Sequence, residues 1–357
     1  MSKKVKRWMS LVLAGLMTLS LFGCGGDTAE GQKTGEGDGQ QGSDGSGYLI
    51  GFSNHSMANT WIVQMEAEFK YHADELKKDG VISDYIMTNA QGDSTKQISD
   101  MQDLITKGCD AIIVSAGNPD ALAPVCEEAV AEGITVISAD QLVNSDKMDA
   151  YVSFRYYDYG KSIGDFMMEN LPDGGKIIIL AGIAGSAGTE DQIKGFNDAI
   201  AGSNIEVLTT SYCNWDYAKA KQAMESLVTA YPEIDGIASM GGSMTQAALD
   251  VLDAAGRSVA IPISGEANNG YLKAWKKYKD KGYIGCAPAS LPSQCATALD
   301  VAIECLNGNP PADNRIYVEI PVITEETLDD YLREDYSDSF WNFTILPDEI
   351  LDEMYKE

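Results

Sequence analysis

Histidine and basic residues are scarce in this sequence of 357 residues. Only His55 and His72 are present, so most histidine-based catalysis lacks its usual general base. Lysine and arginine together number 26, against 54 aspartate and glutamate residues, which gives a formal net charge of −28. A chain this acidic is poorly suited to nucleic acid, because Lys and Arg supply the contacts with phosphate groups. We therefore expect no nucleic acid partner, and the charge equally opposes adhesion to an anionic membrane surface.

Metal-ligand spacings and close cysteine pairs are also missing. No cluster of histidine or cysteine has the spacing of a metal site, so we predict none. Export would permit disulfides, but no CxxC pair is present and each of six cysteines lies within an apolar strand or helix pattern. Buried free thiols are the favoured interpretation, with pairing left open. These six are Cys109, Cys126, Cys213, Cys286, Cys295 and Cys305.

The first 23 residues follow the plan of a secretory signal. A basic stretch, Lys3 to Arg7, precedes an apolar run from Trp8 to Phe22 that is too short for a comfortable membrane span. The run ends in Leu21-Phe22-Gly23-Cys24, which resembles the lipobox of bacterial lipoproteins. The resemblance implies cleavage before Cys24 and attachment of a lipid to its sulfur, which would anchor the chain to the outside of the bacterial cell membrane. A plain signal peptide that happens to contain a cysteine is the alternative.

Residues 24–47 are expected to be the lipid anchor and a flexible tether. The stretch from Asp27 to Gly47 is rich in Gly, Gln, Asp, Ser and Glu and has no large apolar residue, so it cannot bury enough surface to fold. As a random coil it should span roughly 25–30 Å, at ~5–6 Å × √n. This composition argues against a transcription factor of the lactose-repressor type, which would need a helix-turn-helix at this place.

From Tyr48 onwards short apolar runs alternate with amphipathic stretches, and the alternation occurs in two blocks. In the first block, the strands expected are Tyr48–Ser53, Tyr85–Asn89, Ala111–Ser115 and Thr135–Ala139, with helices at Asn59–Lys78, Ser94–Lys107 and Pro119–Glu132. In the second, the strands are Lys176–Ala181, Glu206–Tyr212, Gly236–Met240, Val259–Ser264 and Tyr283–Ala287, with helices at Tyr156–Asn170, Thr189–Ala201, Asp216–Ala230, Ser243–Ala255, Gly270–Lys281 and Pro292–Asn307. This pattern predicts an α/β protein with two doubly wound lobes, each built on a parallel sheet. Ligands of such folds bind beyond the carboxyl ends of the strands.

Three loops in each block share one feature: an apolar strand ends in polar or aromatic residues. They read SNHSMANTW (53–61), SAGNPD (115–120), ADQLVN (139–144), AGIAGSAGTED (181–191), YCNWD (212–216) and SGEANN (264–269). In order and spacing, these loops resemble those of the sugar-binding periplasmic proteins of ABC importers, the ribose- and galactose-binding class with the type I fold. The resemblance covers about residues 48–320, although no single motif in it is very specific.

The resemblance implies two lobes joined by a three-strand hinge, with crossings near residues 154, 290 and 320. The first lobe would comprise residues 48–154 and 291–319, and the second residues 155–290 and 320–357. Such a protein is a monomer that captures a solute without chemistry or cofactor and passes it to an ABC permease in the membrane.

In the first lobe the resemblance assigns five residues to the ligand. Asn59 and Trp61 stand where the family has an amide and an aromatic ring, which suit a sugar's hydroxyl groups and its C–H face. Ser115 follows the third strand, and Asp140 matches a family aspartate that grips sugar hydroxyls. Gln141 replaces a family arginine, so a cation is missing. Core packing for Trp61 and capping for Ser115 and Asp140 are the structural alternatives.

Around the crossings and in the second lobe, six more positions are candidates. Arg155, at the first crossing, could replace the missing cation or could be a hinge or surface residue. Trp215 matches a family aromatic residue, and Glu266 matches a family aspartate. Three positions depart from the family pattern: Glu190 in place of an arginine, Gly241 in place of a polar residue, and Ser290 in place of a glutamine.

These departures make ribose itself a doubtful ligand. Asp140, Glu190 and Glu266 face at most one cation, so we expect a neutral polyhydroxylated ligand or one that carries a positive group. An anionic sugar phosphate is disfavoured by charge repulsion.

Two other functions use the same residues. The fold can serve as a sensing module for a chemoreceptor or a sensor kinase, and the sequence does not separate this from transport. A hydrolase could use Asp140 and Glu266 as an acid–base pair, but carboxylates that bind hydroxyls explain the same residues. In the tail, the apolar residues Phe340, Trp341, Phe343, Ile345 and Leu346 are expected to pack on a lobe near the hinge.

Overall fold

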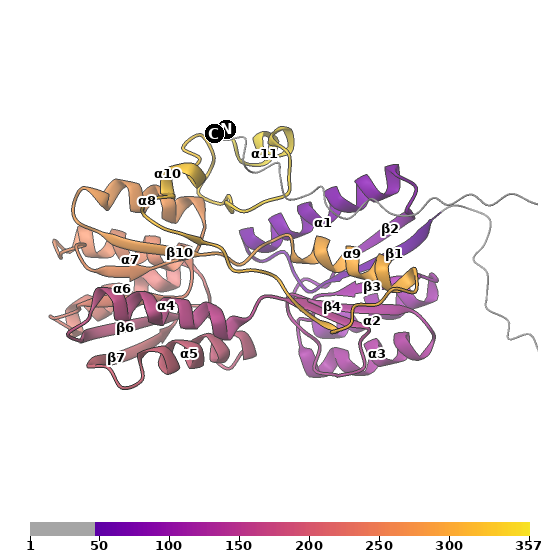
Figure 1. Cartoon of the computed structure of the whole chain (residues 1–357), viewed down its shortest axis with the longest axis horizontal. Coiled ribbons are helices and arrows are strands. Elements are labelled where there is room, and N and C mark those ends of the chain that lie inside the picture. Colours follow the sequence, from indigo (N-terminus) through magenta and orange to yellow (C-terminus); the bar gives the residue numbers. More distant parts are fainter. Residues whose placement is uncertain (1–46) are drawn as a thin grey trace, which may run out of the picture. The chain divides into compact units, whose positions relative to one another are not determined.

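The computed structural model describes residues 47–357. The predicted signal peptide, Cys24 and nearly all of the predicted tether lie outside this range. Within it, the chain forms two six-stranded sheets, each with helices packed against it (Figure 1). None of the helices in residues 47–357 is long and apolar enough to cross a membrane.

The first sheet has the strand order β11-β5-β4-β3-β1-β2, and all its strands are parallel. Its strands are β1 (Tyr48–Asn54), β2 (Ile82–Asn89), β3 (Ala111–Val114), β4 (Thr135–Ala139), β5 (Ala150–Ser153) and β11 (Arg315–Tyr317). Its helices are α1 (Thr60–Lys78), α2 (Ser94–Thr106), α3 (Pro119–Ala131) and α9 (Gln294–Leu306). Apolar side chains of α1 and α9 form the core on one face, and those of α2 and α3 form the core on the other. We call these elements the first lobe.

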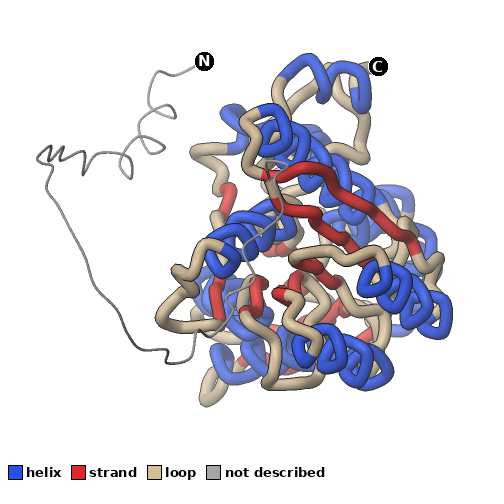
Figure 2. Tube along the Cα trace, turned by 90° about the vertical axis from the view of Figure 1, so that its right-hand side faces the viewer, coloured by secondary structure: helices blue, strands red, loops and turns tan. Residues whose placement is uncertain are grey.

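The second sheet has the order β12-β10-β9-β8-β6-β7, in which only the edge strand β12 is antiparallel. Its strands are β6 (Gly175–Ala181), β7 (Ile205–Tyr212), β8 (Gly236–Ser239), β9 (Pro262–Ser264), β10 (Ile284–Pro288) and β12 (Val322–Ile323). Its helices are α4 (Tyr156–Asn170), α5 (Ala187–Ile200), α6 (Tyr217–Ala230), α7 (Gly242–Ala254) and α8 (Asn269–Lys279). Helix α4 packs with α5, and α7 packs with both α6 and α8. These elements form the second lobe. Figure 2 shows the strands of the chain in red, among the helices in blue.

Several helices begin at a short polar side chain at the end of the preceding loop. Asn59, Asn118 and Asp216 each accept a hydrogen bond from a backbone N–H in the first turn of α1, α3 and α6. Such caps satisfy N–H groups that have no partner within the helix. Because these loops follow strands, the caps also fix where the loop residues lie at the carboxyl edge of each sheet.

The alternation predicted from the sequence is confirmed: both lobes are α/β assemblies of the type expected, with sheets that are parallel except at the edge strand β12. Strand β9 is shorter than predicted, since it begins at Pro262, and Val259 is buried as a loop residue instead. The short strands β5, β11 and β12 were not predicted. All six cysteines of the described range are free, and only Cys305 is not fully buried.

The chain crosses between the lobes three times: from β5 to α4, from β10 to α9, and from β11 to β12. After β12 follow the short helix α10 (Leu328–Tyr331) and then α11 (Asp348–Tyr355). Side chains of this last segment form a separate small core with residues of α1.

Candidate functional site

A buried carboxyl group lies at the end of β4 in the first lobe. Asp140 is only 4% exposed, and its backbone is in the left-handed region, with φ of 58°. Its Oδ2 accepts a hydrogen bond from Ser115 Oγ at 3.0 Å, and its Oδ1 accepts one from Gln294 Nε2 at 3.1 Å. His55 Nδ1 lies 3.1 Å from the same Ser115 hydroxyl. The carboxyl group is thus held in one orientation by side chains from the end of β3 and from α9.

A second buried carboxyl group comes from the other lobe. Glu266, in the loop between β9 and α8, is 8% exposed, and its carboxylate accepts a hydrogen bond from the Ser290 hydroxyl. Tyr156 stands at the start of α4, where its hydroxyl accepts a hydrogen bond from Gln141 Nε2 at 3.3 Å. The Gln141–Tyr156 bond thus joins the loop after β4 to the start of α4, and the Ser290–Glu266 bond joins the loop after β10 to the loop after β9.

Burial dominates the ionisation of these groups. It raises the pKa of both Asp140 and Glu266 to about 7, and the hydrogen bonds that each accepts offset only part of that rise. The pKa of Tyr156 lies well above its ordinary value, first through burial and then through the charges of Asp140 and Glu266. Burial lowers the pKa of His55, so this imidazole is neutral at pH 7. Buried acids with raised pKa values in one cluster are typical of functional sites.

Two tryptophan rings are fixed close to these acids by their N–H groups. Trp61 Nε1 donates to the backbone oxygen of Ser290 at 3.1 Å, and Trp215 Nε1 donates to the backbone oxygen of Met240 at 3.0 Å. Both residues are only partly buried. Trp215 also has a left-handed backbone, with φ of 55°. An indole ring held by its N–H can offer its face to the C–H side of a ligand.

Two glycines make room for Trp215. A Cβ atom on Gly182 would lie 2.1 Å from Trp215 Cζ2, and one on Gly241 would lie 2.9 Å from Trp215 Cδ1. The indole ring thus fills the space that a side chain at position 241 would need. A Gly182→Ala change should displace this ring and destabilise the fold by about 1–3 kcal/mol, the usual cost of overpacking. Urea unfolding measures this cost.

The matched control uses a smaller partner side chain. In a Trp215→Leu background, the same Gly182→Ala change should cost much less, because the indole carbons that clash are absent. Equal costs in the two backgrounds would show that Trp215 is not the residue that requires glycine at position 182.

Three predicted residues lie apart from this cluster in their contacts. Asn59 is exposed and caps α1 through a bond from Ile62 N at 2.9 Å. Glu190 is exposed and accepts a hydrogen bond from the backbone N–H of Gly185 at 3.2 Å. Arg155 is exposed and lies 3.7 Å from Asp158 in an ion pair.

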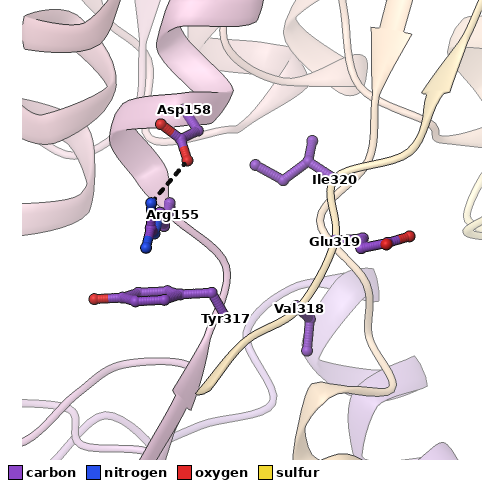
Figure 3. Close-up of a pocket in the computed structure, with 6 residues that line it drawn as sticks. All are labelled: Arg155, Asp158, Tyr317, Val318, Glu319 and Ile320. Atoms are coloured by element: carbon purple, nitrogen blue, oxygen red, sulfur yellow. Dashed lines mark ion pairs between the residues drawn. The ribbon is translucent and has the colours of Figure 1, made fainter. Parts of the chain in front are cut away.

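Arg155 belongs to a pocket at the hinge. Its guanidinium lies 4.3 Å from the centre of the Tyr317 ring, and the pocket of about 270 Å³ runs along residues 317–320 (Figure 3). The walls come from the first and third crossings. Within residues 47–357 Arg155 pairs with Asp158, and no hydrogen bond or ion pair joins it to Asp140.

No sequence pattern pointed to His55, Tyr156 or Gln294 as site residues. Gln294 is fully buried, and its Oε1 has no hydrogen-bond partner within residues 47–357. A glutamine at a helix start carries no sequence signal for this role, because its contact with Asp140 spans 154 positions. Tyr156 was visible only as part of the crossing Phe154-Arg155-Tyr156.

The chemistry of the cluster is that of hydrogen-bond acceptance. Carboxylate oxygens of Asp140 and Glu266 and the amide oxygen of Gln294 are acceptors that hydroxyl or ammonium groups satisfy. No group of three or more possible ligands that could hold a metal ion occurs among the residues that the structure describes. The arrangement is suited to binding a hydroxyl-rich molecule between rings and acids.

Known proteins share sequence with most of this chain. A family model described as "Periplasmic binding protein domain" matches residues 50–310. The ribose import binding protein of Bacillus subtilis (strain 168) is 26% identical over 253 residues, which cover 71% of this chain and 81% of that protein. The xylitol-binding protein of Mycolicibacterium smegmatis is 27% identical over 323 residues, or 90% of this chain and 86% of that protein.

Two solved structures share the fold over most of this chain. An ABC transporter solute-binding protein from Mycobacterium smegmatis with bound glycerol has a TM-score of 0.71 and 25% identity, and the match covers 84% of this chain and all of that one. A solute-binding protein from Bacillus halodurans with bound myo-inositol has a TM-score of 0.72 at 22% identity, over 81% of this chain and 99% of the other. The relatives are binding proteins rather than enzymes. The chain therefore belongs to the periplasmic binding protein family and has its two-lobed type I fold.

Proposed function

We propose that this protein is the receptor of an ABC importer and that it binds a sugar or polyol between its two lobes. The observation that carries the proposal is the pair of buried acids, Asp140 from one lobe and Glu266 from the other, together with the Gln141–Tyr156 hydrogen bond that links the lobes. A ligand whose hydroxyl groups contact both acids favours the conformation in which the lobes are close. Relatives that bind ribose or xylitol support this class of ligand.

The binding residues that we propose are those predicted from the sequence, with Tyr156 and Gln294 added. Trp61 and Trp215 would contact the apolar face of the ring or carbon chain, and the acids would accept from its hydroxyl groups. We keep Asn59, Glu190 and Arg155 in the proposal as residues at the rim of the binding site, since all three are exposed. An anionic ligand would meet two buried carboxyl groups, so sugar phosphates should not bind.

The remaining parts of the proposal concern the setting. A periplasmic binding protein acts outside the cytoplasm, and we propose that a lipid on Cys24 holds this one at the membrane beside its permease, with residues 1–23 removed and residues 24–47 as the tether. Confinement near the permease raises the effective concentration of the loaded receptor. The receptor acts as a monomer without a cofactor, and its two lobes move about the three crossings.

A thermal-shift panel on residues 25–357 tests the ligand class. The panel contains ribose, xylitol, glycerol, myo-inositol, hexoses, a sugar phosphate, amino acids and amines. A ligand at 100 times its Kd adds about 2.7 kcal/mol of stability, which is a readily visible rise in Tm.

We expect a neutral sugar or polyol to raise Tm and the sugar phosphate to leave it unchanged. A rise with amines or amino acids alone would overturn the sugar assignment and favour a cationic ligand. Tight binding of the sugar phosphate would contradict the role given to the two acids.

A further inference from the structure

The C-terminal segment, residues 333–357, contacts both lobes, and we call it the C-terminal clasp. Its link to the first lobe is the side-chain amide of Gln64 on α1, which is fully buried. Gln64 Nε2 donates to the backbone oxygen of Trp341 at 3.0 Å, and Gln64 Oε1 accepts from the Trp341 backbone N–H, also at 3.0 Å. The Trp341 ring N–H donates to Thr60 Oγ1 at 3.1 Å. Trp341 of the clasp is thus bound to α1 by three hydrogen bonds.

The link to the second lobe is the side chain of Asn269, at the start of α8. Its Nδ2 lies 2.8 Å from the backbone oxygen of Arg333 and 3.0 Å from that of Tyr336. Its Oδ1 accepts from the Arg333 backbone N–H at 3.1 Å. The Asn269 backbone N–H donates to the Phe340 oxygen at 2.8 Å, and Asn268 forms an isolated β-bridge with Trp341.

Apolar packing fastens the clasp further. Its buried side chains form a core of their own with Ala67 and Tyr71 of α1. These side chains are Tyr336, Phe340, Leu346, Leu351 and Tyr355. Figure 1 shows the yellow α11 segment between the end that carries α8 and α10 and the helix α1. The sequence predicts that the tail packs on one lobe, whereas in the structure it packs on both.

The clasp is attached to the same two segments that carry proposed binding residues. Gln64 lies three positions after Trp61 on α1, and Asn269 lies three positions after Glu266. In addition, the Asn342 backbone N–H donates to the oxygen of Ala267 at 3.3 Å. The matched family domain ends at residue 310, so the clasp lies outside it.

We propose that the C-terminal clasp holds the two walls of the binding site, α1 with Trp61 and the 266–270 segment, at the separation seen in this structure and opposes their opening, so that Gln64 and Trp341 are positioning residues for solute capture. The role of the clasp in solute capture rests on the proposed function, whereas its attachment to both lobes does not depend on that function. The clasp adds a connection between the lobes beyond the three crossings of the chain. Opening of the lobes on this side must therefore break one of the two attachments, the Gln64–Trp341 bonds or the bonds of Asn269.

Distance measurement between spin labels tests the link without any solute. Labels are placed on exposed lysines of the two lobes, as Lys107→Cys and Lys221→Cys, in residues 25–357. Cys305→Ala removes the one native thiol of residues 47–357 that is not fully buried. Gln64→Leu then leaves the Trp341 backbone groups without their partners. We expect the population at long label separations to rise at least fivefold in Gln64→Leu.

The control is Gln102→Leu, the same change at an exposed position on α2, which should leave the distances unchanged. If Gln64→Leu does not fold, Thr60→Val removes only the acceptor for the Trp341 ring and should shift the distances in the same direction. Unchanged distances in a folded variant would overturn the proposal. With a solute found by the panel, Gln64→Leu should also release it at least fivefold faster, whereas failure of the whole panel would leave the distance result standing.

Discussion

Asp140→Asn is expected to weaken binding of the sugar or polyol by about 10- to 100-fold, while the protein remains folded. Hydrogen bonds to a charged group contribute about 1.5–3 kcal/mol each, and this change removes the charge but keeps the shape. Asparagine also tolerates the left-handed backbone that Asp140 adopts. Isothermal titration with the ligand found by the thermal-shift panel measures the change in Kd.

The hydrogen-bond network around position 140 can adapt to the amide. Gln294 Nε2 would continue to donate to the side-chain oxygen of the substituted residue, and the new amide N–H would donate to Ser115 Oγ. The Ser115 hydroxyl would then donate to His55 Nδ1, which lies 3.1 Å away, once the neutral imidazole carries its proton on Nε2. For this reason the variant tests binding rather than folding. Asp103→Asn, an exposed change on α2, is the control and should bind as the unchanged protein does.

The pH dependence of binding gives an independent readout. Ligand hydroxyl groups donate to ionised carboxylates, and the pKa of Asp140 in the free protein is about 7. Affinity should therefore rise as the pH rises through 7, and this rise should be smaller in Asp140→Asn. Equal affinities of the variant and the original chain for the ligand at pH 8 would show that Asp140 is not a binding residue.

The fold was predictable because its signals are local. Alternation of apolar runs and amphipathic stretches depends on residues close in sequence, and caps such as Asn118 and Asp216 lie beside the helices that they start. The short edge strands β11 and β12 have three and two residues, which is too few for a periodic pattern. They form only because the crossings bring them beside an existing sheet edge.

The candidate site was predictable only in part, for the same reason. Asp140, Glu266 and Trp215 follow strands, so the topology itself brings them to the carboxyl edges of the sheets. Gln294 comes from a helix whose start follows a crossing, and its partner is far away in the sequence. The clasp shows the same limit: the apolar residues around Trp341 predicted packing, but nothing in them specified Gln64 as the partner.

Ligand-free stability is expected to fall as the pH rises from about 5 to 8. Three buried acids, Glu68, Asp140 and Glu266, have folded-state pKa values raised to about 7, each mainly by burial. Between about 4.5 and 7 the unfolded chain loses these protons while the folded chain keeps them. Stability from each group is thus complete below the unfolded pKa and is lost as the pH rises through 7, at up to about 1.4 kcal/mol per pH unit per group.

Glu68 is the acid that links this effect to the clasp. It is fully buried on α1, and its Oε1 accepts from Gln64 Nε2 at 2.9 Å. Gln64, Thr344 and the backbone of Ile345 favour its charged form, but burial outweighs them, and its charge adds to the burial that raises the pKa of Tyr355. Ionisation of Glu68 therefore places a charge that burial disfavours beneath the clasp, so the clasp should loosen as the pH rises through about 7.

Urea unfolding at pH 5 and pH 8 measures the fall in the free energy of unfolding. Glu68→Gln, Asp140→Asn and Glu266→Gln should each reduce the difference between the two pH values, because a neutral amide has no proton to lose. Glu206→Gln, at an exposed position on β7, should leave it unchanged. Greater stability at pH 8 than at pH 5 in the original chain would mean that the buried acids are already ionised in the fold. In that case the charge on Glu68 must be matched by a favourable contact, and the clasp would hold equally well on both sides of neutrality.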